Sequence, residues 1–283
     1  MVVDQTQIAG AVRALSGFRP GTPFWRVNRE WLIGLGGARA VLLELAHPLI
    51  AEGVAAHSRY RADPFGRLFR TMRTMPDLTF GDPAVAQRAA RHFQGCHRRV
   101  QGALTAAVGP FAAGAPYTAQ DPLLKLWVLA TLIDSVLLVH ERFVRPLSEH
   151  ERERYYQDAQ RLAEWLGLPP ALMPATYADF QAYVSAMLAS DLLTVGDRAR
   201  DIVAALYGAP LFGGLAWRAS YVSIGLLPAR LRAAYGFAWS SADERRLARL
   251  AAVSRRLRPW LPAILLVHPK ALWAEWAVAA RSH

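Results

Sequence analysis

Apolar residues recur at three- and four-residue spacing along most of the chain, which is the pattern of amphipathic helices. The signals for strands are nearly absent, since there are no clean alternating segments and no Asn-Gly or Asp-Gly turns. The spacing predicts helices near residues 25–34, 38–57, 64–75, 82–108, 121–143, 148–166, 176–190, 194–207, 214–225, 241–257 and 268–280. No internal repeat or long linker separates them. We therefore expect one all-α domain over residues 1–283.

Residues that cap helices stand at many of the predicted starts. Three starts combine an aspartate with a following proline: Asp63-Pro64, Asp82-Pro83 and Asp121-Pro122. The proline costs nothing there because the first helical N–H has no partner within the helix. Capping boxes, in which a hydroxyl residue precedes an acidic residue by three positions, are expected at Ser148–Glu151, Thr176–Asp179 and Ser241–Glu244.

The segment 121–143 is apolar on all sides, which predicts a central buried helix. Asp134 is the only carboxylate in its apolar run Leu126–Val139, and it shares a helix face with Thr131 and Ser135. A buried carboxylate without a partner costs several kcal/mol. Asp134 is therefore expected to pair either with an arginine in a purely structural role or with a residue of a buried functional site.

The composition supports a folded protein and excludes several classes. Of 283 residues, 53% are hydrophobic and 19% are charged, which provides a sizeable core and excludes intrinsic disorder. The single cysteine, Cys96, excludes a disulfide framework within the chain and is expected to be a small buried residue. No uncharged apolar run reaches the roughly 18 residues that span a bilayer, and Met1–Gly10 lacks the pattern of a secretory signal. We expect a soluble cytoplasmic protein without stable membrane insertion.

The chain is strongly basic, with a net charge of +11, and all of its 33 basic residues except Lys125 and Lys270 are arginines. This balance indicates either an anionic partner or an arginine-rich solvated surface. No run of five or more basic residues occurs. Because the clustered stripe that nucleic-acid binding needs is missing, we do not expect a nucleic-acid partner.

His97 lies on an apolar stripe of the predicted helix 82–108. The stripe consists of Ala86, Ala89, Phe93, His97, Val100 and Leu104. His97 is therefore expected to point inward, either as a core histidine or as a metal ligand. A single imidazole cannot make a closed zinc site, which needs four ligands. A haem can be held by one proximal histidine in an apolar pocket, so haem iron is the metal hypothesis for His97.

Arg67, Arg70 and Thr71 share one face of the predicted helix 64–75. Such a face is either solvated or supplies hydrogen-bond donors to a pocket. Arginine suits haem propionates or an oxygen species, because its guanidinium stays charged and donates in a fixed fork. The three residues are the candidate catalytic groups, and Arg67 is also a candidate for cofactor binding.

Short motifs follow one another in a defined order along the chain. They include Leu45-Ala46-His47-Pro48, His57-Ser58, Asp63-Pro64, Arg67-x-x-Arg70-Thr71, Phe80-Gly81, His97-x-x-Val100-x-Gly102 and Trp127-Val128-x-Ala130-Thr131. In order and spacing they resemble the MpaB/rubber-oxygenase catalytic-domain family. Further matches extend to Tyr235-Gly236, so the resemblance covers nearly the whole chain.

The resemblance implies an all-helical fold with a globin-like core and additional helices around a pocket for haem b. The family's proximal histidine falls on His97, and its distal segment falls on Arg67, Arg70 and Thr71. Rubber oxygenases carry, at the position of Arg70, a lysine that can bind the iron. Arginine stays protonated, so we expect that ligation to be lost here. A histidine common in the family is replaced by Leu129, which marks a divergence.

These features predict a haem b-dependent oxygenase, or a related oxidative enzyme, that acts on an apolar small molecule and dioxygen. His97 would hold the iron, and Arg67, Arg70 and Thr71 would polarise bound oxygen. Asp134 would belong to the shell of the haem pocket, bonded to His97, Arg67 or Arg70. The alternatives are a haem sensor or carrier without turnover, and an apolar-ligand-binding protein without haem. The formation of a homo-oligomer stays open.

Overall fold

The computed structural model describes residues 18–58, 74–207 and 215–281. This part of the chain is mainly helical, so the all-α prediction is confirmed. The α-helices are α2 (Pro23–Asn28), α3 (Gly34–Leu45), α4 (Pro48–His57), α6 (Pro83–His97), α7 (Pro122–Phe143), α8 (Glu149–Trp165), α9 (Tyr177–Ala189), α10 (Asp197–Tyr207), α11 (Leu215–Gly225), α12 (Ala229–Ala234), α13 (Ser241–Leu257), α14 (Ala263–Leu266) and α15 (Pro269–Arg281). Short 3-10 helices are η1 (Trp31–Ile33), η2 (Pro170–Leu172) and η4 (Arg258–Trp260), and residues 74–80 are also helical.

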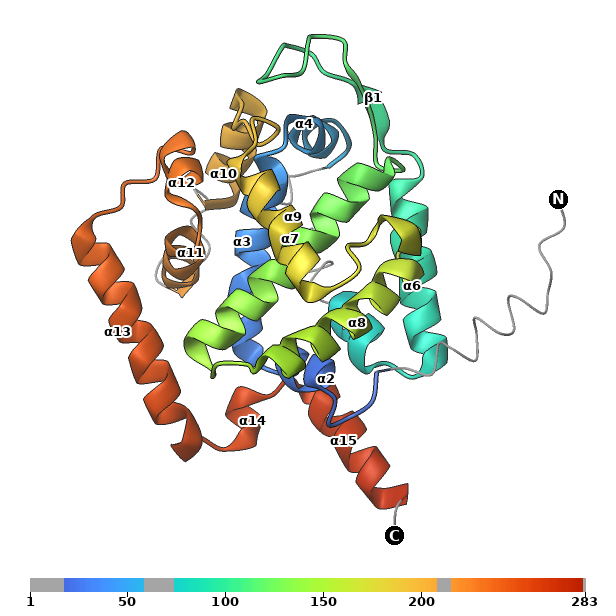
Figure 1. Ribbon diagram of the computed structural model, residues 1–283, viewed down its shortest axis with the longest axis vertical. Helices are drawn as coiled ribbons and strands as arrows, with labels where there is room; N and C mark the ends of the chain where they lie inside the picture. The colour runs from blue at the N-terminus through green and yellow to red at the C-terminus, as the bar shows by residue number, and fades with distance from the viewer. Residues whose placement is uncertain (1–17, 59–73, 208–214, 282–283) are drawn as a thin grey trace, which may run out of the picture.

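Helix α7 runs through the middle of the molecule and packs chiefly along α3 (Figure 1). Trp127 on α7 is fully buried, and its Nε1 donates a hydrogen bond to the carbonyl oxygen of Leu43 on α3, at 3.3 Å. The hydroxyl of Tyr235 donates to the neighbouring carbonyl of Leu42, at 2.6 Å. One cluster of buried apolar side chains extends from Phe18 to Ala271. The prediction of a central buried helix is therefore confirmed.

Helix α7 is long and apolar enough to be compared with a membrane-spanning helix. By length and composition alone, α7 could cross a membrane, and the bent pair formed by residues 31–45 and 48–57 passes the same test when taken as one unit. Half of the most apolar part of α7 is buried inside the structure. The core helix of a folded domain meets the same criteria, so the test does not by itself require a membrane.

Helices α3 and α7 approach each other closely at Gly36. A Cβ atom at this position would lie 2.8 Å from the carbonyl oxygen of Ser135, which is backbone and cannot move without α7. A Cβ atom at the next residue, Gly37, would meet nothing within 4 Å. The two adjacent glycines therefore differ in packing while sharing a helix.

Gly36→Ala is expected to lower the free energy of unfolding by about 1–3 kcal/mol, because the two helices must move apart. Gly37→Ala is expected to raise it by about 0.5–1 kcal/mol, since alanine reduces the freedom of the unfolded chain. Urea denaturation of both variants measures the difference. Equal stability of the two variants would show that the close approach is wrong.

The predicted helix 38–57 is two helices. Residues 31–45 and α4 meet at an angle of 104°, and His47 at the corner has an extended backbone. Pro48 explains the break, because its ring disfavours a helical conformation for the preceding residue and it has no N–H to donate. The apolar pattern continues through the corner, so periodicity alone did not show the bend.

The predicted helix 82–108 ends at His97 and is followed by a hairpin. Strands β1 (Gln101–Ala103) and β2 (Pro116–Thr118) pair in antiparallel register and form the only sheet in the described ranges. Gly109 and Gly114 in the connection have φ angles of +57° and +81°, which favour glycine. The helical spacing of Val100 and Leu104 was therefore coincidental.

Most predicted caps are formed. Asp82 and Asp121 accept hydrogen bonds from first-turn amides of α6 and α7, and the capping boxes of α8 and α9 are present. The third box is shifted by one residue, since Ser240 rather than Ser241 caps α13, with Asp243 as its partner. Asp63 and most of the predicted helix 64–75 lie outside the described residues.

Candidate functional site

His97 is the last residue of α6 and is half-buried. Its Nδ1 lies 2.7 Å from the carbonyl oxygen of Phe93, one turn earlier, and the two rings pack at a centroid distance of 4.3 Å. A carbonyl oxygen can only accept, so the proton is on Nδ1 and the lone pair is on Nε2. Ligating histidines are oriented by this kind of bond to a carbonyl. Nε2 is therefore the ring atom of His97 through which this tautomer would bind a metal.

The donor set around His97 decides which metal centre fits. No group of three or more His, Cys, Asp or Glu that could hold a metal ion occurs in the part of the chain that the structure describes. A closed zinc site needs four protein ligands. A haem brings its own porphyrin nitrogens and needs only an axial imidazole. The residues present therefore fit a haem better than a metal ion held by the protein alone.

The hairpin follows the end of α6, and helix α4 packs against both of its strands, at one end of the molecule (Figure 1). The ring of His57 on α4 is hydrogen-bonded through Nε2 to the carbonyl oxygen of Gln101 on β1, at 3.1 Å. Tyr117 on β2 packs so closely that a Cβ on Gly53 would lie 3.3 Å from its ring, and one on Gly102 would lie 2.6 Å from its hydroxyl oxygen. These contacts bring the motifs around His57 and His97 together.

Glu52 is a buried carboxylate in this region that the sequence analysis missed. It lies on α4, is 5% exposed, and accepts hydrogen bonds from the Thr105 hydroxyl at 3.2 Å and from Nε of Arg198 at 3.3 Å. Burial, with a smaller contribution from Glu52, raises the pKa of Tyr117. The signal that singled out Asp134, one acidic residue within an apolar helix, is also present in α4.

His47 is buried at the corner between α3 and α4. Its ring packs against Phe111 at a centroid distance of 5.2 Å, and among the described residues its Nδ1 has no hydrogen-bond partner. Burial lowers the pKa of His47 to about 4, and the negative charge of Asp121 only partly opposes this. His47 is therefore neutral in the folded protein at pH 7.

The buried imidazole of His47 predicts acid sensitivity. Above pH 6.5 the His47 ring is neutral in both the folded and the unfolded protein, so its titration does not affect stability. As the pH falls from 6.5 toward 4, the unfolded chain binds the proton and the folded protein does not, so the free energy of unfolding decreases. The loss amounts to at most about 3 kcal/mol. His47→Leu should remove part of the dependence of the unfolding free energy on pH between 7 and 4.5, because burial also lowers the pKa of His140 to about 4 and that residue contributes over the same range. His150→Leu, at an exposed position, should remove less. If His47→Leu keeps the full dependence, the assignment is wrong.

Asp134 is paired with an arginine, which is one of the two outcomes that the sequence left open. Its Oδ2 accepts a hydrogen bond from Nη1 of Arg39 at 2.7 Å, and Arg39 also donates to the hydroxyl of Ser135 and to the carbonyl of Leu226. The face of α7 that carries Asp134 is turned toward α3, whereas His97 lies on α6. The pair with Arg39 agrees with the structural alternative, while Arg67 and Arg70, the other partners predicted for Asp134, lie outside the described residues.

The candidate catalytic residues Arg67, Arg70 and Thr71 lie outside the described residues. In sequence they stand between the end of α4 and the helical residues 74–80. Cys96, expected to be buried, is exposed, and its Sγ lies 3.5 Å from Nε2 of His92. The error arose because Cys96 precedes His97 on α6 and so lies about 100° from it around the helix.

Comparison with known proteins identifies the family. The family described as "ER-bound oxygenase mpaB/B'/Rubber oxygenase, catalytic domain" matches residues 25–256. The chain belongs to this family. Two relatives, the uncharacterized proteins Mb2261 of Mycobacterium bovis and Rv2237 of Mycobacterium tuberculosis, are each 27% identical over 250 residues, which is 83% of this chain and 93% of theirs. No solved structure matches the chain significantly.

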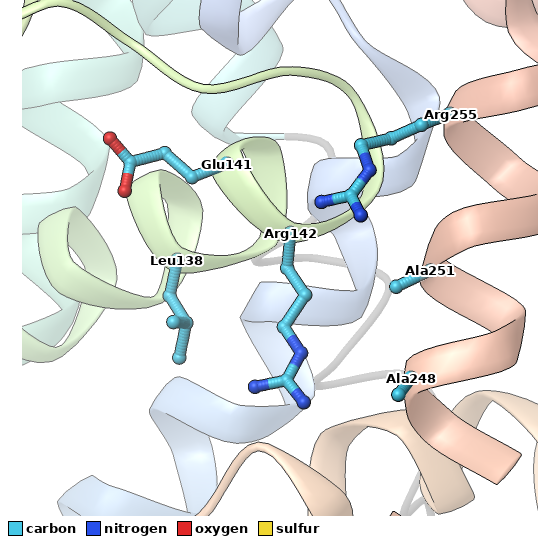
Figure 2. Close-up of a pocket in the computed structure, with 6 residues that line it drawn as sticks. All are labelled: Leu138, Glu141, Arg142, Ala248, Ala251 and Arg255. Atoms are coloured by element: carbon cyan, nitrogen blue, oxygen red, sulfur yellow. The ribbon is translucent and has the colours of Figure 1, made fainter. Parts of the chain in front are cut away.

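Two pockets of this oxygenase-family domain lie at the C-terminal end of α7, far from His97. The first has a volume of about 380 Å³ and lies between α7 and α13, where the side chain of Arg142 extends between the helices and Glu141 points away from α13 (Figure 2). The second, of about 390 Å³, adjoins it at Arg255. Helix α7 spans about 30 Å, and the hairpin lies at its other end. Neither pocket contains a predicted site residue.

Proposed function

We propose that this protein is a haem b-dependent oxygenase that acts on an apolar small molecule and dioxygen, with His97 as the axial ligand. The observation that carries the proposal is the 2.7 Å bond between Nδ1 of His97 and the carbonyl oxygen of Phe93. It holds the imidazole in the tautomer that coordinates through Nε2. Membership of an oxygenase family supports the reaction class.

Each part of the chain has a defined task in this proposal. The Phe93 carbonyl orients the His97 ring and makes Nε2 more basic. The bound haem supplies the chemistry of dioxygen, which side chains cannot perform alone. Arg67, Arg70 and Thr71 keep the task that the sequence assigns to them, which is to donate hydrogen bonds to the oxygen substrate. Phe93, packed on the His97 ring, provides apolar surface and supports an apolar organic substrate.

The absorption spectrum of the protein, produced with added haem precursor, tests the proposal. We expect a Soret band and about one haem per chain, because one axial histidine holds one haem. Absence of the band would overturn the haem assignment and favour an apolar-ligand-binding protein. The haem-loaded protein should then consume oxygen when candidate alkenes are added. Haem binding without oxygen consumption would favour the sensor or carrier instead.

A further inference from the structure

The surface between α13 and α15 exposes large apolar side chains on a short segment of chain. In Leu257–Leu265, which we call the apolar tip, Trp260 is 83% exposed, Ile264 72% and Leu265 62%, and Leu257 and Leu261 are also exposed. Isolated apolar residues on a surface are ordinary, but a contiguous group marks a binding surface. On α13, Leu250 and Val253 extend this group toward the tip at helical spacing.

The apolar tip is held firmly at both of its ends. On the α13 side, the hydroxyl of Ser254 donates to the carbonyl oxygen of Phe143 at 2.8 Å, and Arg258 is paired with the buried Glu30. On the α15 side, Val267 is buried and forms a bridge with Glu30, and the amide of His268 donates to the carbonyl oxygen of Arg29 at 2.7 Å. The fold therefore presents the tip on an anchored base.

Positive charge surrounds the apolar tip. Between Glu244 and Glu275 the sequence contains seven arginines and lysines and no acidic residue. Four of these arginines form no ion pair with any described residue: Arg245, Arg249, Arg255 and Arg256. Their charges are therefore available to an anionic partner.

The pocket of about 390 Å³ at the base of the tip adds to this charge. Five arginines line it: Arg26, Arg29, Arg145, Arg255 and Arg258. Among the described residues, three carboxylates are paired with them: Glu30, Glu151 and Glu275. Pro259, beside Trp260, lines the same pocket, so the arginines and the tip form one continuous surface.

We propose that the apolar tip docks on the surface of an anionic lipid membrane. Tryptophan favours the interface between headgroups and acyl chains, and Ile264 and Leu265 would enter the acyl region, while the arginines bind lipid phosphates. A second copy of this chain fits less well, because a symmetric contact would bring the same unpaired arginines together. The docking surface lies at the opposite end of α7 from His97, so the proposal is independent of haem binding.

Co-sedimentation with vesicles tests the proposal on the full chain. The wild type is expected to sediment with vesicles of phosphatidylcholine and phosphatidylglycerol in equal parts, and much less with phosphatidylcholine alone. Trp260→Ser/Ile264→Ser/Leu265→Ser should weaken partitioning at least about tenfold without lowering the melting temperature, since these side chains are exposed. Leu123→Ser is the matched control, because Leu123 is 63% exposed at the far end of α7.

The charge contribution is tested separately. Arg249→Gln/Arg256→Gln should weaken binding to the anionic vesicles more than Arg88→Gln/Arg91→Gln, a pair of exposed arginines on α6 with the same change in net charge. Raising the ionic strength from about 0.1 M to about 1 M should weaken wild-type binding as well. The proposal is overturned if the wild type does not sediment, or if the triple serine variant sediments as the wild type does. It is also overturned if the tip instead forms a dimer that the triple variant abolishes.

Discussion

His97→Ala is expected to abolish stoichiometric haem binding and to leave the helical circular dichroism nearly unchanged. The side chain is half-buried at the last residue of α6, and its hydrogen bond to Phe93 lies within the same helix. Removing it therefore deletes a ligand without opening the core. The haem content after production with haem precursor, and the Soret absorbance per chain, measure the effect. Added imidazole should restore part of the absorbance in the variant, because it can occupy the vacated ligand position.

His92→Ala is the control for this prediction. His92 lies on the same helix, is exposed, and has Cys96 as its described contact. It should retain the wild-type haem content. If His97→Ala keeps its haem with an unchanged spectrum, His97 is not the ligand, and His47 or His57 becomes the candidate. Failure of imidazole to restore any absorbance would indicate that the variant lost the pocket rather than the ligand.

The helices could be predicted because their signals are local. An aspartate before a proline, or a serine three residues before a glutamate, stabilises a helix start whatever the rest of the chain does, and Asp82, Asp121 and Ser148 behave accordingly. The bend at His47 and the hairpin after His97 were missed for a common reason. At both places the apolar spacing continues while the backbone changes direction. The spacing of apolar residues does not report backbone angles, so it could not indicate either change.

In the candidate site, too, contacts between residues near in sequence could be predicted and contacts between distant residues could not. The hydrogen bond of His97 to Phe93 spans four residues, so the position of the histidine on α6 already contains most of its geometry. The partners of Glu52 and Asp134 do not follow from the sequence, since Arg198 and Arg39 lie 146 and 95 residues away. Which of 33 basic residues meets a given carboxylate depends on how helices pack. The need for a partner was predictable, and its identity was not.

Arg39→Met is expected to lower the free energy of unfolding by about 3 kcal/mol. The Arg39 side chain is 4% exposed, and it neutralises Asp134 while donating to Ser135 and to the carbonyl of Leu226. Methionine fills similar space but leaves the buried Ser135 hydroxyl and the buried carbonyl of Leu226 without their donor, which carries a desolvation cost. It also removes the countercharge of Asp134, whose side chain is 28% exposed. Arg152→Met is the matched control: its bond to Glu141 is of similar length, at 2.6 Å, but its side chain is 32% exposed. That variant should lose at most about 1 kcal/mol.

Asp134→Asn separates the structural role of this pair from a role in the haem pocket. It keeps the shape of the side chain and removes the charge that Arg39 neutralises, so it should destabilise the protein and leave the spectrum of bound haem unchanged. In the double variant with Arg39→Met, the loss of unfolding free energy should be smaller than the sum of the two single losses by about 1–2 kcal/mol. The reason is that the charge of Asp134 destabilises the folded protein only when Arg39 is absent, and the double variant no longer carries that charge. A changed reduction potential with little loss of stability would instead place Asp134 in the haem pocket. Since the carboxylate is bonded to α3 at 2.7 Å, the structure favours the loss of stability.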